Sequence, residues 1–252
     1  MLGVFDSGSG GLTALGLLHR LLPEADLCYL GDPARLPYGK RPDGVIRQYA
    51  REAVAFFERR GARALLCACG TVSTVALPGL LAPFPLFGVA VPAAMEAARI
   101  SRTGKIGIIG TDAAIRSGVY STALRHFRPD AQAVCVPCPL FVPLAEYGYR
   151  AQDPVVRRAT QRALAPIRRS GCDVLILGCT HFVALRSAIA AAVPGVALVD
   201  CGEAGARLFA DAFPERGSGR VEVYVTESPA AFDRIAYLRG IPDYPGAQKT
   251  LL

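Results

Sequence analysis

The chain has 252 residues, of which 52% are hydrophobic and 19% are charged, which is typical of one large or two small globular domains. It lacks the run of about 18 apolar residues that a membrane helix needs, and Leu2–Phe5 already has the pattern of a first buried strand rather than of a leader peptide. The net charge of +7 comes mostly from arginines scattered over predicted helices, so we expect neither a nucleic-acid partner nor a membrane partner.

The first predicted unit is a strand, a glycine-rich loop and a helix. Leu2–Phe5 is followed by residues 6–11 and then by a helix from Leu12 to Leu22. Such a loop can bind phosphate, but its spacing fits no nucleotide-binding pattern and an acidic residue precedes it. The sequence favours a tight turn that presents the Asp6 carboxylate and the Ser7 hydroxyl.

A second strand, Leu27–Leu30, leads to a loop that contains Pro37-Tyr38-Gly39. The loop residues are as consistent with a plain turn as with a binding role. A helix with an apolar stripe is predicted from Pro42 to Arg60, with Asp43 or Asp32 as its cap.

Two segments of the chain are near copies of each other. Residues 65–71 and 175–181 each form a short apolar run that ends at a cysteine, Cys69 or Cys179, followed by small or polar residues. Such runs predict buried parallel strands, and the carboxyl ends of these strands are where open α/β folds bind ligands. We therefore expect the two cysteines to face each other across one site.

The duplication extends over most of the chain. Residues 107–111 repeat the pattern of residues 3–7, strand then polar turn, so a second unit begins near Lys105. The sequence predicts an α/β fold of two pseudo-symmetric lobes with mainly parallel sheets and the active site in the cleft between them. We assign residues 1–93 plus 206–252 to the first lobe and 94–205 to the second. Later elements expected are a helix from Pro154 to Ser170, begun by Asp153 and bent or tightened near Pro166, and then a helix, a strand and a helix after residue 203.

The eight cysteines are expected to be reduced, as in a cytoplasmic protein. Cys135 and Cys138 form a C-x-x-C pair, which raises zinc or thiol redox chemistry, but no histidine provides further ligands nearby and no helix opens at the pair. We therefore expect no metal. The remaining four are interpreted as small buried apolar side chains: Cys28, Cys67, Cys172 and Cys201.

Cys69 and Cys179 differ from the others because each stands at a strand-to-helix junction. A helix N-terminus lowers the pKa of a thiol, which we expect to fall toward neutrality. His181 is a candidate proton partner, with Asp6 and Glu146 as supports. A single Cys–His pair would suggest a nucleophile. Two symmetric thiols instead suggest an acid and a base on opposite faces of one carbon, as racemisation requires.

Five motifs resemble those of the bacterial glutamate racemases, in the cofactor-independent aspartate/glutamate racemase superfamily. They occur in the same order over nearly the whole chain: Asp6-Ser7-Gly8, Pro37-Tyr38-Gly39, Cys69 with Thr71, residues 141–146 and Gly178-Cys179-Thr180-His181. The resemblance implies conversion of L-glutamate to D-glutamate for peptidoglycan without a cofactor.

The resemblance also implies which residues act. Cys69 and Cys179 would be the catalytic acid and base, assisted by Asp6, His181 and Glu146. The residues implied to line the amino-acid substrate are Asp6, Ser7, Tyr38, Gly39, Gly70, Thr71, Thr180 and His181. Family members commonly form homodimers, and the helices around residues 45–57 and 204–213 offer apolar surface, so we expect a homodimer.

Two positions depart from the family pattern. Gly70 stands where Asn is usual, and Ala114 stands where Thr is common, so two polar side chains are missing near the expected substrate. This leaves glutamate and aspartate both open as substrates. We expect a weakened KM for glutamate and expect Gly70→Asn to lower it, with a clash at residue 70 as the competing outcome.

Overall fold

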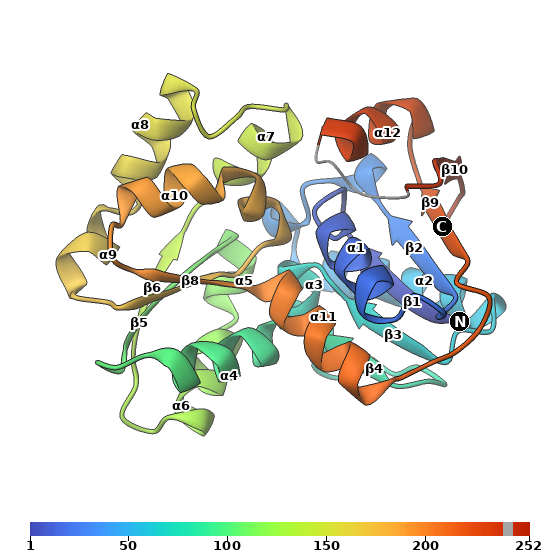
Figure 1. Ribbon diagram of the computed structural model, residues 1–252, viewed down its shortest axis with the longest axis horizontal. Helices are drawn as coiled ribbons and strands as arrows, with labels where there is room; N and C mark the ends of the chain where they lie inside the picture. Colours follow the sequence, from blue (N-terminus) through green and yellow to red (C-terminus); the bar gives the residue numbers. More distant parts are fainter. Residues whose placement is uncertain (239–243) are drawn as a thin grey trace.

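The computed structural model describes residues 1–238 and 244–252 and contains two sheets, shown side by side in Figure 1. The larger sheet has the strand order β10-β9-β2-β1-β3-β4 and the smaller one β6-β5-β7-β8. Every strand pair is parallel. The α/β class with mainly parallel sheets is therefore confirmed.

The strands of the larger sheet come from both ends of the chain: β1 (Leu2–Asp6), β2 (Leu27–Gly31), β3 (Ala64–Cys67), β4 (Leu86–Gly88), β9 (Val221–Val225) and β10 (Ala247–Lys249). The smaller sheet comes from the middle: β5 (Lys105–Gly110), β6 (Gln132–Pro137), β7 (Val174–Leu177) and β8 (Ala197–Asp200). The central strands β1, β3 and β7 are buried at every residue, as expected where helices cover both faces.

Helices cover the sheets and connect their strands. They are α1 (Leu12–Leu21), α2 (Asp43–Arg59), α3 (Gly70–Val75), α4 (Ala90–Ile100), α5 (Asp112–Arg116), α6 (Val119–Phe127), α7 (Phe141–Glu146), α8 (Pro154–Ala163), α9 (Ala165–Ser170), α10 (Arg186–Ala192), α11 (Cys201–Ala212) and α12 (Pro229–Leu238). Three 3₁₀ turns complete the set: η1 (Pro33–Arg35), η2 (Tyr38–Lys40) and η3 (Thr180–Leu185). Among the described residues, no helix combines the length and the apolar character needed to cross a membrane.

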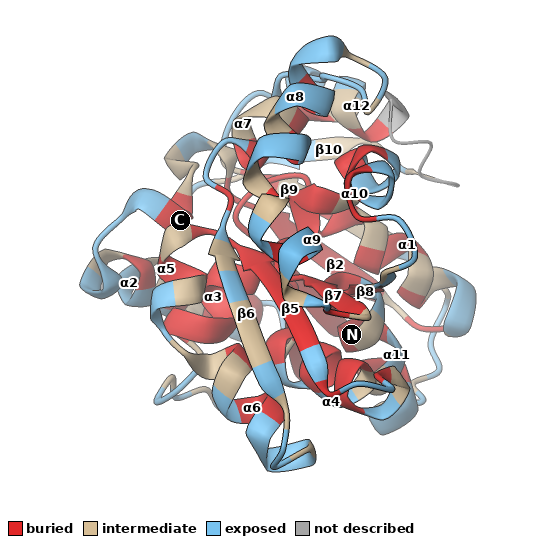
Figure 2. Cartoon of the chain, turned by 90° about the vertical axis from the view of Figure 1, so that its left-hand side faces the viewer, coloured by how far each residue is buried: buried red, intermediate tan, exposed pale blue. Residues whose placement is uncertain are grey.

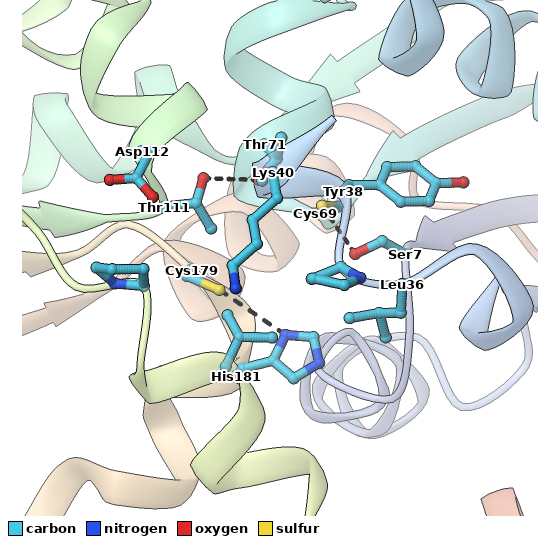
Figure 3. A pocket seen from close by; sticks show the side chains of 14 residues that line it. Ser7, Leu36, Tyr38, Lys40, Cys69, Thr71, Thr111, Asp112, Cys179 and His181 are labelled. Carbon is cyan, nitrogen blue, oxygen red and sulfur yellow. Dashed lines mark hydrogen bonds between the residues drawn. The ribbon is translucent and has the colours of Figure 1, made fainter. Parts of the chain in front are cut away.

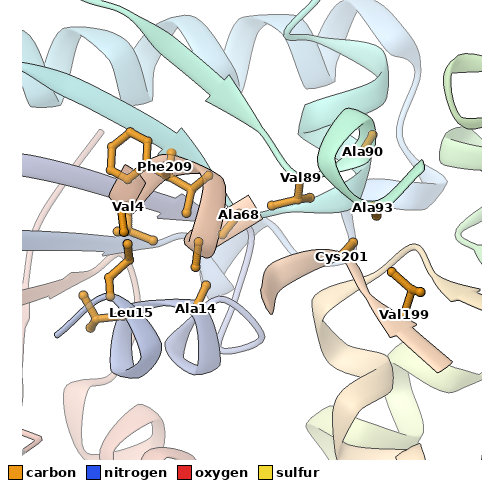
Figure 4. Packing of buried hydrophobic residues seen from close by; sticks show 14 of the residues in the cluster. Val4, Ala14, Leu15, Ala68, Val89, Ala90, Ala93, Val199, Cys201 and Phe209 are labelled. Carbon is orange, nitrogen blue, oxygen red and sulfur yellow. The ribbon is translucent and has the colours of Figure 1, made fainter. Parts of the chain in front are cut away.

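Helix α4 packs against β7 and β8 of the smaller sheet, helix α11 packs against β3 and β4 of the larger one, and the two helices contact each other. Figure 4 shows Val89 and Ala93 of the α4 region close to Cys201 of α11, while Phe209 of α11 reaches the cluster around Val4 of β1. A Cβ on Gly205 would lie 2.6 Å from Val89, so only glycine allows this close approach. The two helices thus help to hold the lobes in register; the lobe boundaries near residues 93 and 205 stay a prediction.

Several sequence-based expectations need correction. Neither Asp43 nor Asp32 caps α2, because the N-cap residue is Pro42 and the Asp32 side chain is used elsewhere. The helix expected from Pro154 to Ser170 with a bend near Pro166 is two separate helices, because the helical backbone is interrupted at Leu164. Strands β6 and β10 were not predicted, because both have weak apolar patterns; Figure 2 shows β6 largely exposed.

The apolar surface expected for self-association is absent from the two helices proposed. The apolar side chains of α2, such as Phe56 and Phe57, and those of α11, such as Phe209, are buried inside the chain. These stripes stabilise the protomer because each helix packs its apolar face on a sheet. A homodimer therefore stays a prediction that depends on the resemblance alone.

Candidate active site

The loops that follow β1, β3, β5 and β7 meet at one pocket, where the two cysteine loops face each other (Figure 3). Its lining residues come from both lobes: Ser7, Leu36, Pro37, Tyr38, Gly39, Lys40, Cys69, Thr71, Thr111, Asp112, Pro139, Val142, Cys179 and His181. The centre of a water molecule has only about 20 Å³ in which to move there, little more than one water needs. The structure therefore has the lobes closed over the site.

Cys69 is held at the start of α3, and its side chain is 5% exposed. Its Sγ lies 3.3 Å from the Ser7 hydroxyl. Burial raises the pKa of the Cys69 thiol to about 12, and the Asp6 carboxylate adds to the rise, although the Ser7 contact acts against it. The expected lowering by the helix is wrong for Cys69. A helix of six residues has a weak N-terminal field, and loss of solvation outweighs it.

Cys179 stands on the other side of the pocket with a histidine as its neighbour. Its Sγ lies 3.8 Å from Nδ1 of His181, and the opposite ring nitrogen, Nε2, is hydrogen-bonded to the Glu146 carboxylate. Burial alone would lower the pKa of His181, but the Glu146 charge and the Cys179 contact outweigh burial and raise that pKa to about 10. His181 is therefore a cation at neutral pH, and it places positive charge beside Cys179.

Asp6 connects the lobes behind the pocket. One carboxylate oxygen accepts from the Gly8 amide at 2.9 Å, and the other accepts from the Thr180 hydroxyl at 2.9 Å. The Ser9 hydroxyl, from the same loop, donates to Glu146 at 2.9 Å. Asp6 is fully buried, and neither it nor Thr180 lines the pocket. Their expected contact with substrate stays a prediction, and in this structure their hydrogen bond joins the loop after β1 to the Cys179 loop.

Tyr38 lies at the pocket through its backbone, while its ring points away from the cysteines (Figure 3). The phenol donates to the buried carboxylate of Asp32. This carboxylate also accepts from the Arg35 guanidinium and from the hydroxyl of Thr226, the residue that follows β9. Burial raises the pKa of the Tyr38 phenol, so it stays protonated as a donor. The buried carboxylate thus anchors the loop at the pocket edge.

Thr71 and Thr111 meet across the cleft, with their hydroxyl oxygens 2.9 Å apart. Thr111 was not among the predicted site residues, although the repeat places it at the position equivalent to Ser7. That equivalence was the signal that could have found it. Lys40 was not among the predicted site residues either, because it lies just outside the Pro37-Tyr38-Gly39 motif.

Gly70 lies outside the pocket lining and packs against the other cysteine loop. A Cβ on Gly70 would lie only 2.1 Å from the carbonyl oxygen of Gly178. Such a contact is far inside van der Waals distance and involves backbone, which cannot rotate away. The expectation that Gly70→Asn improves binding is therefore contradicted, and the competing outcome, a clash, is the one that the geometry favours.

The other cysteines lie in the places that the sequence indicated. Cys28, Cys67, Cys172 and Cys201 are all buried, as predicted. Cys135 is exposed on β6 while Cys138 is buried beyond the end of that strand. In the part of the chain that the structure describes, no three His, Cys, Asp or Glu side chains are grouped so that they could hold a metal ion.

Two α/β lobes meet at a pocket that a pair of thiols lines from opposite sides, and comparison with known proteins assigns the chain to the amino-acid racemases, which are isomerases. Residues 17–209 match the model of the Asp/Glu/Hydantoin racemase family. The chain belongs to this family.

Curated relatives and solved structures agree with the family match. The chain is 44% identical to the glutamate racemase of one strain of Thermus thermophilus, over 93% of this chain and 90% of that protein. The crystal structure of glutamate racemase isoform RacE1 from Bacillus anthracis matches with a TM-score of 0.92 at 30% identity, over 100% of this chain and 97% of that one. The glutamate racemase of Francisella tularensis in complex with D-glutamate matches with a TM-score of 0.89 at 26% identity, over 99% and 97%.

Proposed function

We propose that the protein interconverts L- and D-glutamate without a cofactor and so supplies D-glutamate for peptidoglycan precursors. The observation that carries the proposal is the pair of thiols, Cys69 and Cys179, that line one closed pocket from opposite lobes. The names of its relatives support glutamate as the substrate: proteins 37–44% identical over more than nine-tenths of the chain are glutamate racemases.

The two thiols have different surroundings, which supports different starting roles. Nδ1 of the cationic His181 lies 3.8 Å from the Cys179 sulfur, and this neighbouring positive charge supports Cys179 as the first base. Cys69 starts as a neutral thiol because its pKa is raised to about 12. We therefore assign Cys69 as the first acid and Cys179 as the first base, since a proton transfer across a single carbon requires one of each.

Racemisation then follows in two proton transfers. The Cys179 thiolate takes the α-proton of glutamate, so that the Cα–H bond breaks, an S–H bond forms and the electron pair moves toward the adjacent carboxylate. The Cys69 S–H bond then breaks as its proton joins Cα on the opposite face with that electron pair. Cys69 is left as the thiolate, and the reverse reaction begins from this state.

The same geometry explains how a thiol of high pKa can act as a base in the reverse direction. The substrate brings an ammonium group into the closed pocket, close to the side of the Ser7 hydroxyl and the Asp6 carboxylate. This positive charge offsets the Asp6 charge that disfavours a thiolate at Cys69. Substrate entry must also widen the pocket, because the closed form has room for little more than one water.

The test is incubation of the purified protein with L-glutamate and, separately, with L-aspartate, without added cofactor, followed by chiral separation. We expect D-glutamate to form, and in deuterated water we expect the product to carry deuterium at Cα. Prior treatment with a chelator should leave the rate unchanged. A higher kcat/KM for aspartate would refute the substrate assignment and leave the two-thiol mechanism in place, whereas no racemisation of either would refute the proposal.

A further inference from the structure

We propose that Lys40 is a specificity-determining residue that binds the side-chain carboxylate of the substrate and so selects an acidic amino acid. The inference deepens the proposed racemisation of glutamate and rests on it. Lys40 is the last residue of η2, and it lines the same pocket as Cys69 and Cys179. Figure 3 shows its side chain extended into the pocket, with Nζ directed toward the side where Cys179 and His181 lie.

The position of Lys40 is set by the residues before it. The phenol of Tyr38 is fixed to the buried Asp32 carboxylate, and Gly39 packs so closely on Thr111 that an added Cβ would lie 2.5 Å from the Thr111 Cβ. The backbone on the N-terminal side of Lys40 is therefore held from both lobes. The lysine starts from a fixed point at the edge of the pocket, which is what a binding residue needs.

The ammonium group of Lys40 has no charged partner among the described residues. Among the described residues no ion pair or hydrogen bond involves its Nζ, and no other lysine or arginine lines the pocket. The pocket also holds one carboxylate, that of Asp112, at its opposite rim (Figure 3). An exposed ammonium without a partner at the edge of the pocket is available to a bound anion.

The proposed substrate supplies that anion. Glutamate carries two carboxylates and one ammonium, and its reacting carbon must sit between the two thiols. The thiols and the neighbouring hydroxyls of Ser7 and Thr71 surround the amino-acid end, so the side-chain carboxylate must extend toward the pocket edge, where the Lys40 loop lies. A point charge on a flexible side chain suits this end, since it binds a carboxylate without a fixed orientation.

The test compares the KM and kcat of Lys40→Met, Lys40→Arg and the wild type with glutamate. Lys40→Met keeps the length of the side chain and removes the charge, so we expect KM to rise about tenfold with little change in kcat. Tenfold corresponds to about 1.4 kcal/mol. This is small for a hydrogen bond to a charged group because Lys40 is exposed to solvent. Lys40→Arg should restore most of the affinity.

Two further variants separate the alternatives. Arg47→Met removes an equal charge from an exposed position on α2 and should leave KM unchanged. Asp112→Asn removes a negative charge from the pocket rim and should lower KM. The alternative is a latch, meaning an ion pair of Lys40 with Asp112 that forms across the pocket. In that case Lys40→Met and Asp112→Asn should raise KM to the same extent. The inference is overturned by an unchanged KM in Lys40→Met, by a fall in kcat alone, or by the latch result. If the wild type does not racemise glutamate, the proposed function fails instead.

Discussion

Replacing Gly70 by alanine tests the closeness of the two cysteine loops. The added Cβ would lie 2.1 Å from the carbonyl oxygen of Gly178 and 3.0 Å from its carbonyl carbon, whereas real Cβ atoms stay beyond 3.0 Å and rarely come within 3.4 Å. The loops must therefore separate by about 1 Å. Because Gly70 follows Cys69 and Gly178 precedes Cys179, the movement shifts both thiols relative to each other.

The substitution affects both stability and rate. Forcing an extra carbon into a packed site costs about 1–3 kcal/mol of unfolding free energy, and a misplacement of about 1 Å at reacting groups costs on the order of a hundredfold in rate. We therefore expect Gly70→Ala to lose about a hundredfold in kcat/KM and to unfold at a temperature lower by several degrees. Gly70→Asn should lose at least as much, since a chain with Asn at this position needs a wider gap between the loops.

The matched control is Gly44→Ala on α2, where no atom lies within 4 Å of the added Cβ. That variant should keep full activity and gain up to about 1 kcal/mol of stability, because alanine favours a helix over glycine. Polarimetric rates with glutamate and thermal unfolding by circular dichroism measure both effects. The reasoning would be refuted if Gly70→Ala kept the kcat/KM and the melting temperature of the wild type. A lower KM for glutamate in Gly70→Asn would refute it as well.

Two other predictions concern the site, and a third concerns assembly. Cys69→Ser and Cys179→Ser should each lose nearly all racemisation, because a hydroxyl is a far weaker acid than a thiol and is not ionised to act as a base at neutral pH; full activity in either would exclude the two-thiol mechanism. The folded-state pKa of His181, about 10, lies above its ordinary 6.5, so its contribution to stability is complete below pH 6.5 and is lost as the pH rises through 10. Urea unfolding at a series of pH values should show this decline in the wild type and a smaller one in Glu146→Gln; equal slopes would contradict the coupling. Light scattering at micromolar concentration should give the mass of a dimer, and a monomer mass would end that expectation.

Local patterns in the sequence determined the fold class and the position of the two cysteines. A short apolar run that ends at Cys69 or Cys179 encodes a buried strand, and parallel strands place their ends at one edge of a sheet. The duplication and the order of the motifs therefore indicated a site between two lobes. The same patterns failed for β6, whose residues are half exposed and so carry little periodic signal.

Only the tertiary structure decided what each side chain contacts. The direction of the Tyr38 ring depends on Asp32, whose carboxylate is also tied to Thr226 far along the chain. The raised pKa of Cys69 depends on its burial. The need for glycine at position 70 depends on the Gly178 carbonyl oxygen of the other lobe, which leaves no room for a Cβ. Distances between the lobes are set by how α4 and α11 pack, which no local pattern encodes. The sequence thus determined the residue types at the site, and packing between the lobes decided their geometry and their charge.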